Sequence, residues 1–192
     1  MNHKILIYKG IFSFSEALDA GFSRSTITRL ARDGTFIKLS RALYKHSEVR
    51  IDPQDEEYAI GCSLFGPKSY VGALSALSHW NLTDSAPKAV WMMIPYSRKH
   101  KDERVYQSIQ TKMSFSAGII KRKHYRIAST ERAILEVLKY EKRFGWSTSI
   151  NAAREAIRRK MTTVKKLGDM SSKLKLKKLL YANLEAIELD EP

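Results

Sequence analysis

The sequence contains little cysteine and no long apolar run. Only Cys62 among its 192 residues is a cysteine, and its place in the apolar stretch 58–65 predicts a buried small side chain with no disulfide partner in the chain. No apolar run reaches the roughly 18 residues that a membrane-spanning helix needs. The opening residues, MNHKILIYKG, lack the apolar core of a signal peptide. We therefore expect a cytoplasmic protein without a membrane partner.

Acidic residues are scarce relative to basic ones. There are 34 Lys and Arg against 20 Asp and Glu, which gives a formal net charge of +14 and a pI of about 9.9. The excess is concentrated at the two ends, at +5 over residues 1–50 and +12 over residues 96–192, whereas residues 51–95 carry −3. Such a surplus favours a polyanionic partner such as DNA or RNA, and its distribution favours two basic surfaces.

Motifs of catalysis and of metal binding are also missing. The chain has no glycine-rich phosphate loop and no histidine pair at metal-ligand spacing, and its carboxylates are not clustered as a Mg²⁺-dependent nuclease requires. His79 stands beside Trp80 in an apolar segment, which predicts a packing role. His100 and His124 lie among basic residues, which oppose a metal ion. We expect no catalytic residue, no metal and no cofactor, so that the protein is not an enzyme.

Two short helices are indicated near the N-terminus. Ser13 followed three residues later by Glu16 is a capping box that begins a helix, and Gly21 is suited to end it. Ser23 can cap a second helix, which Gly34 would end. Two helices joined by a few residues that include a glycine are typical of a helix-turn-helix.

The second of these helices has the composition of a DNA-recognition helix. Ile27, Leu30 and Ala31 form an apolar stripe that can pack on the preceding helix. The remaining face combines hydroxyls and arginines, which can contact base edges and phosphates, and its N-terminus directs backbone N–H groups toward an anion. The DNA-binding residues that we predict here are Ser23, Arg24, Ser25, Thr28, Arg29 and Arg32.

A basic hairpin is expected to follow. Residues 36–39 and 43–45 favour strands, with a tight turn at 40–42 between them. Its basic residues, which we expect to contact the DNA backbone, are Lys38, Arg41 and Lys45. With a leading helix over residues 3–8, the segment 1–50 reads as a winged helix-turn-helix DNA-binding domain.

Residues 51–192 are expected to form a second domain that is mixed and rich in helices, so that the fold class of the whole chain is α+β. The expected helices cover residues 53–65, 72–82, 130–140, 151–160 and 172–187. The expected strands cover residues 89–95, 104–114 and 119–127. The first of them is a continuous apolar run, which predicts a central, buried strand.

A second group of basic residues lies in this domain. It comprises Arg98, Lys99, Lys101, Arg104, Lys121, Arg122, Lys123 and Arg126. If the two segments pair across a sheet, they form one positive patch. That patch is either a solvated surface or a second site for a polyanion or an acidic partner.

The stretch ALDAGFSRSTITRLARDGTFIKLSRALY resembles the N-terminal winged-helix domain of AbiEi-type antitoxins. The later segments YVGALSALSHWNL, AVWMMIP and YRIASTERAILEVLKY are similar to the C-terminal domain of that family. The resemblance implies that the N-terminal domain binds double-stranded DNA at inverted repeats in its own promoter and represses its own operon. It also implies that the C-terminal domain opposes a nucleotidyltransferase-like toxin, AbiEii, in a type IV toxin–antitoxin pair of phage defence, without the need for a stable complex.

Two alternatives remain open from the sequence. A winged-helix domain can also be part of a DNA-cleaving defence nuclease. The second basic group can instead bind RNA, which would make the C-terminal domain an RNA-binding module.

Overall fold

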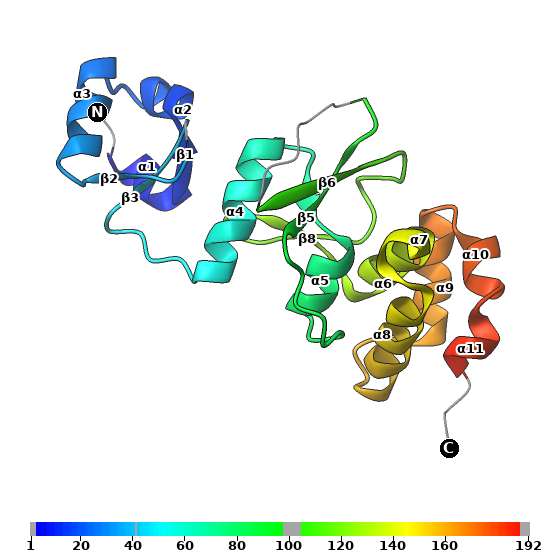
Figure 1. Ribbon diagram of the computed structural model, residues 1–192. Helices are drawn as coiled ribbons and strands as arrows, with labels where there is room; N and C mark the ends of the chain where they lie inside the picture. The colour runs from blue at the N-terminus through cyan, green and yellow to red at the C-terminus, as the bar shows by residue number, and fades with distance from the viewer. Residues whose placement is uncertain (1–2, 41, 98–104, 189–192) are drawn as a thin grey trace. The chain divides into compact units, whose positions relative to one another are not determined.

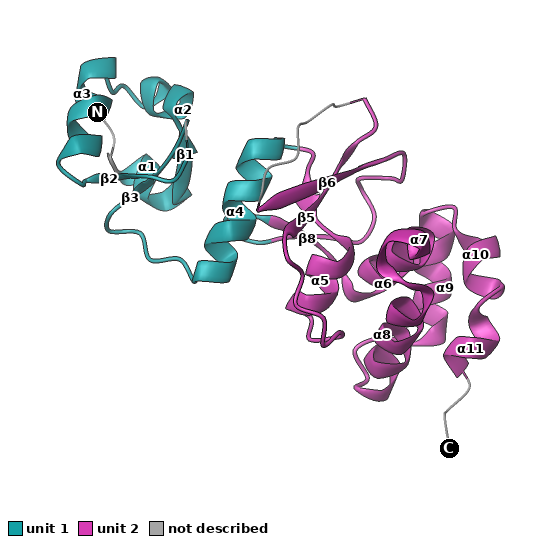
Figure 2. Ribbon diagram, viewed as in Figure 1, with its two compact units in different colours: residues 1–67, 122–125 teal, residues 68–121, 126–192 magenta. Residues whose placement is uncertain are grey.

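The computed structural model describes residues 3–40, 42–97 and 105–188, and the chain divides into two compact units. The first unit comprises residues 1–67 together with the short segment 122–125, and the second comprises residues 68–121 and 126–192 (Figure 2). The structure is α+β, as predicted. That residues 1–50 act as a domain of their own stays a prediction.

The first unit has the element order of a winged helix-turn-helix. Its elements are α1 (His3–Lys9), β1 (Ile11–Ser13), α2 (Phe14–Asp19), α3 (Arg24–Arg32), β2 (Phe36–Lys38), β3 (Leu43–His46) and α4 (Pro53–Phe65) (Figure 1). The leading helix, the helix pair, the hairpin and the helix after Asp52 are all confirmed. Cys62 is buried in α4, as expected.

The ends of α2 follow from its local sequence. The Ser13 hydroxyl accepts the backbone N–H of Glu16 at 3.2 Å, and the Glu16 carboxylate accepts the backbone N–H of Ser13 at 2.7 Å, which is the predicted capping box. Burial raises the pKa of the Glu16 carboxyl, but the hydrogen bonds from Lys9 and Ser13 outweigh it, so that this pKa lies below its ordinary value. At the other end Gly21 takes a φ of +87°, which glycine adopts without strain and which turns the chain into α3.

The wing is part of a three-stranded antiparallel sheet with strand order β1-β3-β2. Lys45 on the central strand faces Ile11 on one side and Ile37 on the other. The sequence analysis missed β1, because three residues are too few to display an alternating pattern. Its role is to tie the wing to the start of α2.

Aromatic side chains fill the core of this unit. Phe36 is fully buried and meets Phe12 and Phe22 edge-on, with ring centroids 5.0 and 5.5 Å away. Ile27 and Leu30 of α3 belong to the same buried cluster. The cluster therefore fixes α3 against the wing.

The segment 122–125 completes the first unit from a distant part of the sequence. Nδ1 of His124 lies 3.0 Å from the carbonyl oxygen of Lys9, and the Tyr125 ring meets the Tyr58 ring edge-on at 5.4 Å. Burial and a hydrogen bond to Asp55 raise the pKa of the Tyr125 hydroxyl. Four residues from elsewhere in the chain thus cover the junction of α1 and β1 and the face of α4.

We expect Gly10→Ala to destabilise the protein more than Gly34→Ala. Both glycines have a φ near +80°, so alanine costs about 1–2 kcal/mol at either place. A Cβ on Gly10 would stand 2.6 Å from Cε1 of His124, whereas nothing lies within 4 Å of a Cβ on Gly34. Displacing the His124 ring should add about 1 kcal/mol or more to the loss in free energy of unfolding. Urea denaturation measures both variants, and equal losses would contradict the packing of His124 on Gly10.

The second unit contains a five-stranded mixed sheet and a group of helices. Its strands are β4 (Tyr70–Val71), β5 (Val90–Pro95), β6 (Tyr106–Thr111), β7 (Ile119–Lys121) and β8 (Arg126–Ala128), in the order β6-β5-β4-β8-β7. Its helices are α5 (Ala73–His79), α6 (Thr130–Lys139), α7 (Glu141–Phe144), α8 (Trp146–Arg158), α9 (Val164–Lys173), α10 (Lys177–Tyr181) and α11 (Leu184–Glu188). The interior position of β5 is confirmed, and so is α6 with Ser129 as its N-cap.

Several boundaries differ from the prediction. The strand expected over residues 119–127 is two strands, β7 and β8, joined by a turn in which Arg122 N–H donates to the Tyr125 carbonyl. The helix expected over residues 172–187 is wrong as a single element, because Lys175 takes a left-handed φ of +60° and ends α9 before α10 begins. α5 stops at His79, since Asn81 has a φ of +53°, and α8 begins five residues earlier than expected.

A buried ion pair lies at the centre of the second unit. Glu136 and Arg132, one turn apart on α6, are both fully buried, with Arg132 Nε 2.7 Å from Glu136 Oε1. Oε1 also accepts the Tyr70 hydroxyl at 2.6 Å, and Oε2 accepts the backbone N–H of Ala73 at 2.9 Å. Burial and the neighbouring carboxylate hold the pKa of Tyr70 well above its ordinary value, so that its hydroxyl keeps the proton it donates. The network ties β4 and the start of α5 to α6.

Candidate nucleic-acid interface

The two faces of α3 separate as its sequence predicts. Ile27 and Leu30 are buried in the aromatic core. The exposed residues of the helix include all five predicted on its polar face, namely Arg24, Ser25, Thr28, Arg29 and Arg32. The winged-helix core therefore presents a continuous surface of hydroxyl and guanidinium groups to solvent.

The N-terminus of α3 is organised by Ser23. Its hydroxyl caps the helix by accepting the backbone N–H of Thr26 at 3.1 Å, and it also lies 2.9 Å from the hydroxyl of Ser25. This bonding holds the first turn in place, where outward-directed backbone N–H groups favour an anion. Ser23 is thus a capping residue in the structure, and its contact with DNA stays a prediction.

Contacts along the helix orient two of the predicted base-reading side chains. The Thr28 hydroxyl donates to the carbonyl of Arg24 at 3.0 Å, which fixes the side-chain rotamer. Arg29 lies 3.5 Å from Asp33 in an exposed ion pair. A hydrogen bond from the backbone N–H of Thr35 is the main reason that the pKa of the Asp33 carboxyl lies below its ordinary value, and Arg29 and Arg32 add to it.

The wing residues fall into different environments. Lys38 is exposed at the end of β2. The Lys45 side chain is only 15% exposed and forms an ion pair with Glu56 of α4, so it holds the wing against that helix. Sequence reasoning treated Lys45 as a free cation, because its partner lies on another element. Arg41 lies outside the residues that the structure describes.

Residues 4–44, from α1 to β3, match the family model described as transcriptional regulator, AbiEi antitoxin. This part of the chain is therefore similar to that family of regulators. The match ends within β3, so it includes α3, β2 and the first two residues of β3.

The fold of the whole chain has a counterpart among solved structures. The crystal structure of the RV2827C protein from Mycobacterium tuberculosis is similar with a TM-score of 0.55 and 12% sequence identity, covering 95% of this chain and 78% of that one. An identity this low establishes a shared fold alone, and the similarity extends beyond residues 4–44 into the second unit. No curated protein sequence matches the chain significantly.

That the second basic group forms a single patch stays a prediction, because half of its members lie outside the described residues. β6, which follows the segment of Arg98, Lys99, Lys101 and Arg104, lies at the opposite edge of the sheet from β7, which ends at Lys121. β5, β4 and β8 lie between these two edge strands, so β6 and β7 do not pair with each other. Those first four residues lie outside the described part of the chain.

The remaining members of this group have separate surroundings. Arg122 and Lys123 are exposed but belong to the first unit rather than to the second. Arg126 is partly buried, and its Nε donates to the Ser69 carbonyl at 2.7 Å. Lys121 is exposed at the end of β7.

Within residues 3–40, 42–97 and 105–188, no three His, Cys, Asp or Glu side chains come together so that they could bind a metal ion. No helix in these ranges has both the length and the apolar composition needed to cross a bilayer.

Proposed function

We propose that this protein is a DNA-binding repressor that recognises the promoter of its own operon through α3 and the wing. The main support for this proposal is the exposed polar face of α3. The hydrophobic core holds this helix in place, and the surrounding residues 4–44 match a family of transcriptional regulators. In this proposal α3 enters the major groove, where Arg24, Ser25, Thr28 and Arg29 approach base edges.

Phosphate contacts would come from groups around that helix. Arg32 and Lys38 are exposed on either side of the turn that joins α3 to β2, and the capped first turn of α3 offers backbone N–H groups. To contact a base, Arg29 would leave its ion pair with Asp33. This costs little, because an exposed ion pair contributes at most about 1 kcal/mol. Lys45 would remain with Glu56 and act as a structural residue.

We further propose that the protein is the antitoxin of a type IV pair in phage defence. It would work in the cytoplasm without catalytic activity, opposing a nucleotidyltransferase-like toxin without a stable complex. Support comes from the family description of the N-terminal domain and from the resemblance of the later segments. Inverted repeats in the promoter would be occupied by two copies of the chain, one on each half-site.

The test of DNA recognition is a salt-titrated gel shift on the DNA immediately upstream of the coding sequence, compared with a scrambled duplex of equal length. We expect selective binding to the upstream duplex. Arg24→Ala and Arg29→Ala should each weaken it by about 1–3 kcal/mol, and each should relax sequence preference at one position. Lys38→Ala should weaken both duplexes alike and lower the salt slope by about one unit.

The matched control is Lys166→Ala, which removes one exposed charge from α9 in the second unit and should leave the shift unchanged. Unchanged operator binding in Arg24→Ala and Arg29→Ala would overturn the assignment of α3. Equal binding of the wild type to both duplexes would overturn autoregulation. Rescue of growth on co-expression with the neighbouring toxin gene tests the antitoxin role separately.

A further inference from the structure

An open pocket of about 840 Å³ lies in the second unit, between the edge strand β6 and the chain where α6 passes into α7. Ser108, Ile109 and Gln110 line it from the strand, and residues 139–143 line it from the helices. Its size falls within the roughly 300–1,000 Å³ of typical ligand sites. The proposed function makes no use of it.

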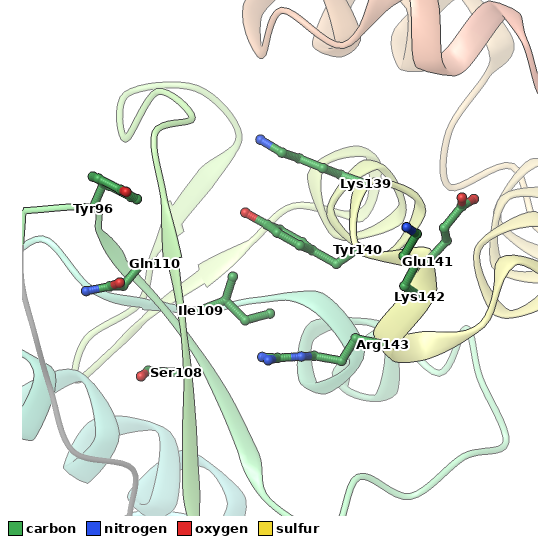
Figure 3. Close-up of a pocket in the computed structure, with 9 residues that line it drawn as sticks. All are labelled: Tyr96, Ser108, Ile109, Gln110, Lys139, Tyr140, Glu141, Lys142 and Arg143. Atoms are coloured by element: carbon green, nitrogen blue, oxygen red, sulfur yellow. The ribbon is translucent and has the colours of Figure 1, made fainter.

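The pocket carries an excess of positive charge. Lys139, Lys142 and Arg143 line it, against the single acid Glu141. The side chains of Lys139 and Arg143 extend toward the side of β6, whereas Glu141 points away from that strand (Figure 3). The side that faces the strand is therefore suited to an anion.

The surroundings of Arg143 and Lys139 favour the binding of an anion. The Arg143 guanidinium carbon lies 5.3 Å from the centre of the Trp91 ring, a cation–π contact that restrains the side chain. Burial lowers the pKa of the Lys139 ammonium, an effect that Glu136 opposes and Arg132 reinforces. An incompletely hydrated ammonium gains more from an anion than a fully hydrated one does.

Aromatic rings border the same space. Tyr96 follows β5 directly and is 60% exposed, with Lys112 Nζ 4.5 Å from the centre of its ring. Tyr140 extends in the same direction as Lys139 (Figure 3) and hydrogen-bonds to Thr111, and burial raises the pKa of its hydroxyl. Exposed rings beside cations are the features on which unpaired bases stack while their phosphates are neutralised.

From this arrangement we propose that the pocket binds a nucleotide, with its phosphates on Lys139 and Arg143 and its base against Tyr96. An acidic peptide would satisfy the cations but would leave the exposed ring of Tyr96 unused. The nucleotide is either free or an unpaired residue of a single-stranded RNA, and the chemistry is the same for both.

Calorimetric titration of the full chain at about 0.15 M salt tests this. The nucleotide probes are adenosine triphosphate and an oligoadenylate RNA of about eight nucleotides. Tripolyphosphate serves as a probe without a base, and polyglutamate as an acidic peptide. We expect the triphosphate or the oligonucleotide to bind, and K139A/R143A to weaken that binding at least about ten-fold through loss of charge-assisted contacts. Binding of the triphosphate identifies a free nucleotide as sufficient, and binding of the oligonucleotide alone identifies a strand.

Two further variants keep the result interpretable. K165A/K166A removes two exposed charges from α9 in the same unit and should leave the affinity unchanged. Y96A changes an exposed ring after a strand end, so it should fold even if K139A/R143A does not, and it should weaken binding about five-fold or more. R24A/R29A should retain nucleotide binding, which separates this proposal from promoter recognition.

Three results would overturn the proposal. One is that neither nucleotide probe binds. Another is that tripolyphosphate or polyglutamate binds as tightly as they do. The third is that K165A/K166A weakens binding as much as K139A/R143A, which would mean that diffuse charge is responsible.

Discussion

Glu136→Ala should lower the free energy of unfolding by about 3–5 kcal/mol, because it leaves a buried guanidinium without its counter-charge. Arg132 is fully buried, and burial opposes its charged form. Glu136 and Tyr70 outweigh this effect and raise the pKa of Arg132 above its ordinary value, so the guanidinium stays protonated. The variant also leaves the Tyr70 hydroxyl and the Ala73 N–H without their acceptor. Urea denaturation followed by circular dichroism measures the effect.

Two controls accompany this variant. Glu185→Ala removes an exposed carboxylate from α11 and should change the free energy of unfolding by no more than about 0.5 kcal/mol. The double change R132M/E136L removes both charges and should cost less than Glu136→Ala alone, because no unpaired ion is left behind. A cost for Glu136→Ala as small as that of Glu185→Ala would show that the ion pair is unimportant.

Phe36→Ala should cost about 3–5 kcal/mol, the usual range for emptying a buried aromatic site. Its ring touches Phe12, Phe22 and His46, with centroid distances of 5.0, 5.5 and 5.8 Å. These contacts lie beneath α3, so that promoter binding should be lost along with stability. Urea denaturation and the gel shift, both on the full chain, measure the two effects.

Ile37→Ala is the matched control, since the next residue on β2 is 41% exposed. It should cost no more than about 1 kcal/mol and should leave the shift in place. Equal losses for Phe36→Ala and Ile37→Ala would contradict the assignment of Phe36 to the core. Loss of stability without loss of promoter binding would instead contradict the role of this core in fixing α3.

Features set by neighbours in sequence were predicted well. The capping box of Ser13 and Glu16 and the cap at Ser23 depend on residues two or three positions apart, and the polar face of α3 follows from helical spacing. For the candidate interface, this was enough to predict which α3 residues are exposed. Their contact with bases is a property of the complex with DNA, and it stays a prediction.

Features set by distant residues were missed. Lys45 reads as a free cation until α4 brings Glu56 to it, and β1 is recognisable only by its pairing with β3. The leucines after Ser172 keep a helical spacing, yet Lys175 breaks the helix without a glycine or proline to signal it. The cations of the pocket come from the end of α6 and from α7 rather than from the basic group of residues 98–104 and 121–126.

Because residues 122–125 belong to the first unit, that unit is completed only after much of the second unit has been synthesised. Ribosomes add about 5–20 residues per second, so Tyr125 is synthesised roughly 3–12 s after Pro67. Until then the nascent winged helix lacks the ring of His124 over Gly10 and the ring of Tyr125 against Tyr58. The first unit is therefore finished late in translation, and a transcript cut short before this segment would yield a chain in which that unit is incomplete.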